Sequence, residues 1–590
     1  MTSSPAGFLA LSTRDGQSAP PGLDAAAEAL GGPVARRVTV GGLTLVLVGV
    51  EAANLGGVQR TAVLARGPRR HEDDLTPAGA AELLADTGRR HQALPPFAVV
   101  GWNERSGEIV AAVDRLGFRH LYARTADGWS ALSTSARALA ALDPSGVDRV
   151  AMAAQSMLGW QLGNRSPFAD VSVAPAGSAV SLDAGQLTAT GAAGSEDGPW
   201  LGLDETVSAA ATLLRGYLGA FLDDHPDAVL QLTGGQDSRI LLGAIPPARR
   251  RGLRVMTLAV QGSADLEIAR DLTRRYGMDH DVIDLDGLDE LDPDAAHALA
   301  TDAARKLECS ADPLAFASVA FAEAKLEPRP RLSGLGGEVT RGFYYLGPAR
   351  SVPVTARRVR RLADWRLFPN EAVPADVLDP AFADWARERT LRELTTILIG
   401  YGPDWLTATD RFYLHQRMHR WAGVLASATC LDRPVVNPML DDRFLELAAR
   451  LRPRDKQGSR FLARLSVRLD EQLSALPLDG RPAPVVYAQP SLRNTAALAA
   501  MTGGKITGKV RQRVRRVGRP PVGGEVLAAK VGEHYRDHPA ALEAVARLRV
   551  VRPDWLAQVA EGRIALGPAA AAMLVNLEVA TAPVRQSLPR

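Results

Sequence analysis

The chain has very little cysteine, almost no excess of charge and no long hydrophobic run. Its two cysteines, Cys309 and Cys430, are too few for a disulfide framework, so a reducing cytoplasm is the simplest location. No apolar run approaches the roughly 18 residues of a membrane helix, and the first residues lack the features of a secretory signal, so we expect no membrane association. The net charge of +3 is too small to indicate a nucleic-acid partner.

What is present is the composition of an ordinary globular enzyme, with 46% hydrophobic and 23% charged residues. A length of 590 residues exceeds what one hydrophobic core usually serves, so we expect two domains, residues 1–200 and 201–590. The first is predicted to be β-rich. Residues 38–50 indicate a hairpin with a turn at Gly41-Gly42, and residues 97–102 and 108–113 are typical of two further strands.

Residues 228–239 are the most informative stretch of the chain. An apolar run at 229–232 predicts a buried parallel strand, and a helix is expected to begin near Ile240. Between them stands a turn of glycine, hydroxyl and carboxylate residues: Thr233, Gly234, Gly235, Gln236, Asp237 and Ser238. Glycines let the backbone approach a ligand closely, and a helix N-terminus attracts an anion.

We therefore expect this turn, together with Leu232 before it, to bind phosphate groups, with Asp237 holding Mg²⁺ beside them. No lysine follows the glycines, so the turn is not the phosphate loop of the common nucleoside triphosphatases. A plain glycine turn between a strand and a helix is the alternative interpretation.

Strand-like and helix-like segments alternate after this turn. Residues 253–260 and 280–285 predict strands, and residues 265–276 predict an amphipathic helix that ends at Gly277. This alternation favours an α/β fold with a doubly wound parallel sheet, in which ligands bind beyond the carboxyl ends of the strands. Asp265 stands at the start of the helix, either as its N-cap or as a ligand.

A second glycine-rich segment with a carboxylate follows at residues 331–339. Its candidate phosphate-binding residues are Ser333, Gly334, Gly336 and Gly337. Glu338 comes directly after them and is a candidate to share Mg²⁺ with Asp237. In isolation the segment is also compatible with a glycine-rich strand end. Two such segments in one α/β domain favour a shared nucleotide–metal site.

These two segments resemble motifs of the asparagine synthetase family of ATP pyrophosphatases, which cut ATP to AMP and pyrophosphate. The turn at 233–238 is similar to the family's SGGxDS loop, with Thr233 in place of serine. The segment at 333–339 is similar to SG(E/D)G(A/G)DE, in which Leu335 and Val339 depart from the family's pattern. Those two losses leave any acid–base role at their positions in doubt.

The resemblance extends, with varying strength, from about Phe97 to about Arg464. Residues 114–122 and 131–139 resemble segments of the family's class II glutamine amidotransferase domain. Residues 256–280 resemble its adenosine-side segment, which makes Thr257 a candidate ATP contact. The resemblance implies a β-rich, N-terminal-nucleophile-like domain, followed by a PP-loop ATP-pyrophosphatase domain with added C-terminal helices.

The expected glutaminase nucleophile is missing. The family carries a cysteine directly after the initiator methionine, whereas Thr2 stands there in this chain and Cys309 is the first cysteine. A terminal hydroxyl is a possible nucleophile in other enzymes. We nevertheless expect an amidotransferase-like scaffold without glutaminase activity.

Two cations are candidates for stabilising charge during the reaction. Residues 460–464 resemble the family's K(W/Y)xLR, with Arg460 at the position of the lysine and Lys456 one helical turn earlier. An arginine cannot act as a general base, but it can hold phosphate oxygens. We expect Arg460 to be the essential cation and Lys456 a helper, and a solvated basic helix face is the alternative.

The resemblance implies that a substrate carboxylate attacks ATP, giving an acyl-AMP and pyrophosphate, and that an amine then displaces AMP. The cofactors are ATP and Mg²⁺. Relatives without the N-terminal cysteine include lasso-peptide macrolactam synthetases and β-lactam or carbapenam synthetases. We favour a peptide cyclase, which would work with a leader-peptide protease, because the basic segment 505–519 suits a longer substrate.

Three alternatives remain open at this point. The chain could amidate a small metabolite in the manner of a glutamine-hydrolysing asparagine synthase or a β-lactam synthetase. It could also be a catalytically inactive nucleotide-binding partner, since several polar positions of the family are altered. The basic segment 505–519 could bind nucleic acid, although it lacks interleaved aromatic residues and a solvated loop is favoured.

Overall fold

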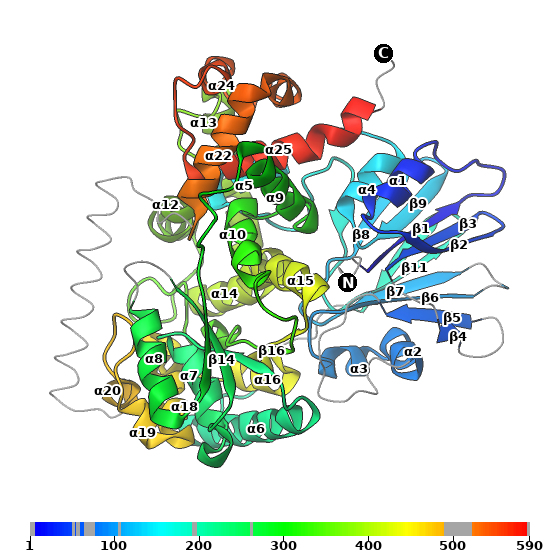
Figure 1. The fold of residues 1–590 in the computed structure, drawn as a ribbon. Coiled ribbons are helices and arrows are strands. Elements are labelled where there is room, and N and C mark those ends of the chain that lie inside the picture. Colours follow the sequence, from blue (N-terminus) through cyan, green and yellow to red (C-terminus); the bar gives the residue numbers. More distant parts are fainter. Residues whose placement is uncertain are drawn as a thin grey trace.

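The structure is a computed structural model that describes residues 6–49, 53–54, 59–63, 77–103, 105, 108–191, 198–259, 264–488 and 522–586. It combines antiparallel sheets with a parallel sheet of five strands and many helices, so the expected α/β class is confirmed at this level (Figure 1). Thr2 and the basic segment 505–519 lie outside the described residues. None of the described helices is long and apolar enough to cross a membrane.

Two antiparallel sheets of six strands each occupy the N-terminal part. The first has the order β10-β8-β9-β1-β3-β2, and the second has the order β12-β11-β7-β6-β5-β4. The strands of the first are β1 (Gly7–Thr13), β2 (Val34–Val40), β3 (Leu43–Val48), β8 (Tyr122–Ala126), β9 (Trp129–Ser133) and β10 (Ser172–Val173). Those of the second are β4 (Ala53–Asn54), β5 (Gln59–Val63), β6 (Ala98–Asn103), β7 (Ile109–Val113), β11 (Ala179–Asp183) and β12 (Gln186–Thr190).

The two sheets pack face to face and are covered by helices on their outer faces. Phe8 of β1 and Val100 of β6 belong to the same buried cluster between the sheets. The neighbouring residue Leu9 points to the other side, because side chains alternate along a strand, and joins the core beneath α4 (Ala136–Leu142). The helices of this part are α1 (Leu23–Ala29), α2 (Pro77–Ala85), α3 (Thr87–Gln92), α4 and α5 (Arg149–Leu158).

The parallel sheet has the order β15-β14-β13-β16-β17. Its strands are β13 (Val229–Gln231), β14 (Arg254–Leu258), β15 (Asp279–Ile283), β16 (Arg331–Leu332) and β17 (Val435–Val436). Successive strands are added on one side of β13 as far as β15, and the chain then crosses to the other side of β13 to form β16. The carboxyl ends of β13 and β16 therefore flank a topological switch point, where such sheets bind ligands.

Helices surround this sheet, and they form the connections between its successive strands. Before β16 they are α6 (Leu203–Asp224), α7 (Gln236–Ala244), η2 (Pro247–Arg249), α8 (Asp265–Tyr276), α9 (Pro293–Lys306) and α10 (Pro313–Glu323). Between β16 and β17 they are η3 (Gly337–Thr340), α11 (Ala356–Leu362), η4 (Ala363–Leu367), α12 (Phe368–Glu371), α13 (Pro380–Gly400), α14 (Trp405–Phe412), η5 (Tyr413–Ala422) and α15 (Gly423–Asp432). The segments η4 and η5 are π-helical.

In its described part, the chain after β17 forms helices joined by turns and loops. It forms η6 (Pro438–Leu440), α16 (Asp442–Ala449), α17 (Pro453–Lys456), η7 (Gln457–Ser459), α18 (Arg460–Leu469), α19 (Glu471–Ser474) and α20 (Pro484–Ala488). The last helices are α22 (Gly524–Asp537), η8 (Pro539–Leu542), α23 (Glu543–Arg547), α24 (Pro553–Ala560) and α25 (Pro568–Gln586).

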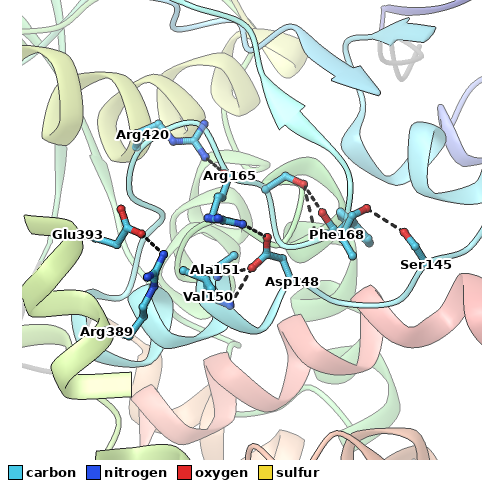
Figure 2. A network of polar contacts seen from close by, with 11 residues as sticks. Ser145, Asp148, Val150, Ala151, Arg165, Phe168, Arg389, Glu393 and Arg420 are labelled. Carbon is cyan, nitrogen blue, oxygen red and sulfur yellow. Dashed lines mark hydrogen bonds and ion pairs between the residues drawn. The ribbon is translucent and has the colours of Figure 1, made fainter. Parts of the chain in front are cut away.

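A polar network joins the antiparallel part to the later helices (Figure 2). Asp148 caps α5 by accepting hydrogen bonds from the backbone N–H groups of Val150 and Ala151, at 2.8 and 2.9 Å. The same carboxylate binds Arg165 at 2.7 Å, and the backbone carbonyl of Arg165 accepts a hydrogen bond from Arg420 of η5. The largest hydrophobic cluster likewise contains residues of both parts, so the two share one core.

Candidate functional site

The turn after β13 is built by its own hydroxyl groups. Ser238 Oγ accepts a hydrogen bond from the Thr233 backbone N–H at 3.1 Å and donates one to the Thr233 carbonyl at 3.2 Å. The backbone N–H of Gly235 donates to Thr233 Oγ1 at 3.1 Å. These bonds fold the turn back onto the first turn of α7, whose N-cap residue is Gly235 and which has no side-chain cap. The hydroxyls that sequence analysis assigned to phosphate groups therefore also shape the turn.

Gly234 lies in a crowded position between two acidic residues. Its backbone N–H donates to Asp265 Oδ1 at 2.7 Å, and its carbonyl accepts from the Asp479 backbone N–H at 3.0 Å. A Cβ atom at Gly234 would lie 2.8 Å from Asp265 Oδ1, so a side chain there would displace the Asp265 carboxylate. Ala264, not Asp265, occupies the N-cap position of α8. The Asp265 carboxylate therefore supports the turn instead of capping the helix.

The second glycine-rich segment meets the first at Asp237. A Cβ atom at Gly334 would lie 2.9 Å from the Asp237 carbonyl carbon, and one at Gly337 would lie 2.2 Å from Asp237 Oδ1. Gly336 has φ +111, a backbone conformation that side chains rarely adopt. The glycines are therefore what allows the two segments to touch. The structure thus brings together both segments at the switch point between β13 and β16.

Two carboxylates and one guanidinium share this contact. Arg341 pairs with Asp237, whose side chain is 17% exposed, and sequence analysis did not identify Arg341. Burial raises the pKa of Asp237 to about 7; Arg341 opposes the shift and the neighbouring charge of Glu338 adds to it. Glu338 Oε2 is buried and has no hydrogen-bond partner within the described residues. Oxygen ligands of this kind suit a hard divalent cation.

Two buried amides near the strand ends are also unsatisfied. Asn437 follows β17 directly and is 1% exposed, and neither its Oδ1 nor its Nδ2 finds a partner in the part of the chain that the structure describes. The Nε2 atom of Gln236 is also buried and has no hydrogen-bond partner among the described residues. Buried polar atoms are normally hydrogen-bonded, so both amides are available to a ligand. A polar residue at the carboxyl end of an apolar strand is the signal by which Asn437 could have been found.

Thr257 and Leu232 are held within the sheet. Thr257 Oγ1 donates to the Leu232 carbonyl at 2.8 Å and also contacts His280 Nε2 at 3.0 Å. The Leu232 backbone N–H donates to the Met256 carbonyl at 2.9 Å, and its side chain is fully buried. Both residues therefore position the strand ends, and their side chains are already engaged by the protein.

The two candidate cations occupy different environments. Lys456 is 4% exposed and binds Asp410 Oδ2 at 2.7 Å, and the same oxygen accepts a hydrogen bond from the Tyr345 hydroxyl at 2.8 Å. A cavity of about 90 Å³ is lined by Lys456, Asp410 and Val339, the residue after Glu338. Arg460 instead pairs with Asp455 at 3.1 Å, and its side chain is 42% exposed. The structure thus places Lys456 beside the second glycine segment.

Comparison with known proteins gives no further guide. No protein-family model and no curated protein matches the chain. Function is therefore inferred from the residues and their geometry.

Proposed function

We propose that the protein is an ATP-dependent amide-bond-forming ligase of the asparagine synthetase type. The observation that carries the proposal is the contact between the two glycine-rich segments at Asp237, on either side of the switch point of the parallel sheet. Each segment follows a neighbouring strand, lacks the Cβ atoms that would keep the segments apart, and contributes a carboxylate. A nucleotide and its metal ion would use both segments at once.

The chain's own groups suit the phosphates of ATP. The uncapped N-terminus of α7 presents backbone N–H groups, and the turn Thr233–Ser238 has the hydroxyls beside them. The predicted ATP contacts at Ser333, Gly334, Gly336 and Gly337 belong to the segment that touches Asp237. Asn437 adds a buried amide and Gln236 a buried Nε2 atom that have no hydrogen-bond partner among the described residues.

Asp237 and Glu338 fit a magnesium ion. The charge of Glu338 helps to raise the pKa of Asp237, and the unpartnered Glu338 Oε2 is an available ligand. When bound, Mg²⁺ would neutralise charge on the phosphates. Arg341 pairs with Asp237 and has to move aside or share that carboxylate with the ion. Its guanidinium is then free to hold a phosphate oxygen.

The geometry favours Lys456 over Arg460 as the cation beside the reacting groups. Lys456 lines the cavity next to Val339, and Asp410 holds its ammonium in place. A fixed positive charge at this point stabilises a pentavalent phosphorus and the departing pyrophosphate. Arg460, paired with Asp455 and half exposed, would support the helix turn that carries Lys456.

A peptide is the substrate class that we favour, with an internal amine closing a macrolactam. Trp200 lines the cavity and is 52% exposed, and Phe343, shortly after the second glycine segment, is 37% exposed. Exposed aromatic side chains beside the site suit a substrate longer than a single amino acid. The antiparallel sheets fit the β-rich amidotransferase-like domain as a scaffold.

The products of ATP turnover test this proposal. The purified protein is incubated with MgATP and peptides that carry a side-chain carboxylate and a free N-terminal amine. Formation of AMP and pyrophosphate, together with loss of one water from the peptide, is the expected result. ADP and phosphate as products would contradict the adenylation chemistry. Turnover with small carboxylic acids but not with peptides would overturn the substrate class alone.

A further inference from the structure

A cluster of histidines and carboxylates lies between α9, α22 and α25, outside the contact of the glycine segments. Asp294 and His297 belong to α9, and Glu578 belongs to α25. His534 belongs to α22, and His538 is the C-cap residue of that helix. The three helices pack against one another in the C-terminal part of the fold (Figure 1). Nothing in the proposed adenylation uses these residues.

Three of these side chains converge on one point. Asp294 Oδ1 lies 2.7 Å from His534 Nδ1 and 3.2 Å from His538 Nε2. One ligand atom from each of the three lies within 4.8 Å of the others. Ligands that are each about 2 Å from a tetrahedral zinc ion are roughly 3.3 Å apart. The two separations from Asp294 Oδ1 are therefore near the spacing of a metal site.

The helix geometry brings the two imidazoles to the same face. The His538 backbone N–H donates to the His534 carbonyl at 2.8 Å, so the helical spacing of four residues is kept up to the cap. Side chains four apart on a helix are neighbours. Two histidines on one helix face and a carboxylate from a second helix are a ligand set that Zn²⁺ uses in proteins.

A second set of contacts fixes the orientation of His534. Its ring stacks on that of His297, with the ring centroids 3.7 Å apart. His297 Nε2 lies 2.8 Å from Glu578 Oε2, which also accepts a hydrogen bond from the Tyr535 hydroxyl at 2.9 Å.

We propose that Asp294, His534 and His538 bind one divalent transition-metal ion of the Zn²⁺ class. Asp294 and His538 are exposed, so the remaining coordination positions are open to water. The ion would join α9 to α22, which are separated by 240 residues in the sequence at Asp294 and His534. Its effect is to fasten the last helices to the helices beside the parallel sheet.

Zinc binding to the full chain tests this inference. After treatment with a chelator, the protein is titrated with Zn²⁺ by calorimetry, and Co²⁺ is used as a coloured substitute that reports the coordination geometry. We expect one ion per chain at this site, a higher melting temperature with Zn²⁺ and a cobalt spectrum typical of tetrahedral nitrogen and oxygen ligands.

Variants separate this site from the proposed magnesium site. His538→Ala and Asp294→Ala remove exposed side chains and are expected to keep the fold, which circular dichroism checks. Each should weaken zinc binding about tenfold or more and abolish the rise in melting temperature. His225→Ala and Asp237→Asn should keep the zinc affinity and the rise in melting temperature of the wild type. The inference is overturned if the wild-type protein binds no Zn²⁺, or if His538→Ala binds it with unchanged affinity.

Discussion

Among single residues, Asp237 is the most important for the proposed site, because its carboxylate is largely buried. Asp237 lies at the first turn of α7, is crowded by the glycines of the second segment and pairs with Arg341. Its raised pKa means that folding favours its neutral form, whereas a metal ligand must be ionised. Residues with shifted pKa values of this kind cluster at functional sites, and such sites often lower the stability of the folded protein.

Replacing Asp237 by asparagine should stabilise the protein and abolish its activity. Burial raises the pKa of Asp237 from 3.8 to about 7, so the folded state holds a proton that the unfolded chain releases at a lower pH. The contribution of this group to the free energy of unfolding therefore falls as the pH rises from about 4 to about 7. We expect Asp237→Asn to melt at a higher temperature than the wild type at pH 8 and at the same temperature near pH 4. Equal melting temperatures at pH 8 would contradict this.

Adding one methyl group at Gly337 should disrupt the site. A Cβ there would lie 2.2 Å from Asp237 Oδ1, so the carboxylate or the second segment has to move. We expect Gly337→Ala to lose pyrophosphate formation while keeping its secondary structure. Gly216 in α6 is the matched control, because nothing lies within 4 Å of its added Cβ, and Gly216→Ala should stabilise the helix by roughly 0.5–1 kcal/mol. Full activity of Gly337→Ala would show that the two segments do not act together.

At the scale of elements, the helices α17 and α18 decide which cation acts. Lys456 ends α17 and reaches the cavity, whereas Arg460 begins α18 and pairs with Asp455. Loss of a charge contact made in the transition state typically slows turnover by about 10²–10³. We expect that loss for Lys456→Ala with little change in ATP affinity, and a smaller loss for Arg460→Ala. A larger loss of turnover in Arg460→Ala than in Lys456→Ala would instead support Arg460 as the essential cation, as the sequence resemblance implies.

Much of this part of the fold is predictable from sequence patterns. The hairpin at 38–50 is found as β2 and β3, and the helix expected to end at Gly277 ends there with that glycine in the left-handed conformation. Alternating strands and helices predicted the parallel sheet. These features are set by neighbours along the chain, through side-chain periodicity and the backbone freedom of glycine.

Other features depend on contacts between distant segments and were missed. The π-helical segments η4 and η5 were not predicted from the sequence. Arg341 could not be assigned, because its partner Asp237 lies 104 residues away.

At the scale of the whole molecule, the antiparallel part and the helical part are joined into one body. They share the largest hydrophobic cluster, and polar contacts such as Ser427 Oγ to the Phe118 carbonyl, at 2.7 Å, cross between them. The antiparallel sheets thus have a structural use that does not require glutaminase chemistry.

The protein should therefore not hydrolyse glutamine. No cysteine precedes Cys309, which is fully buried, and burial raises the pKa of its thiol to about 12. A thiol in that state is a poor nucleophile. We expect no release of glutamate from glutamine, with or without MgATP, and amide formation on the peptide should not require glutamine. Glutamate release by the purified protein that persists after removal of Thr2 would point to a nucleophile elsewhere in the chain.

Exchange of radiolabelled pyrophosphate into ATP tests the proposed adenylation of a carboxylate directly. Exchange occurs only if the enzyme forms an acyl-adenylate reversibly, so it reports the step that the two glycine segments would perform. We predict exchange that requires both Mg²⁺ and a carboxylate substrate in the wild type, and its loss in Asp237→Asn and Gly337→Ala. Exchange that is undiminished in Asp237→Asn would contradict the account, and so would ATP turnover that yields only ADP and phosphate.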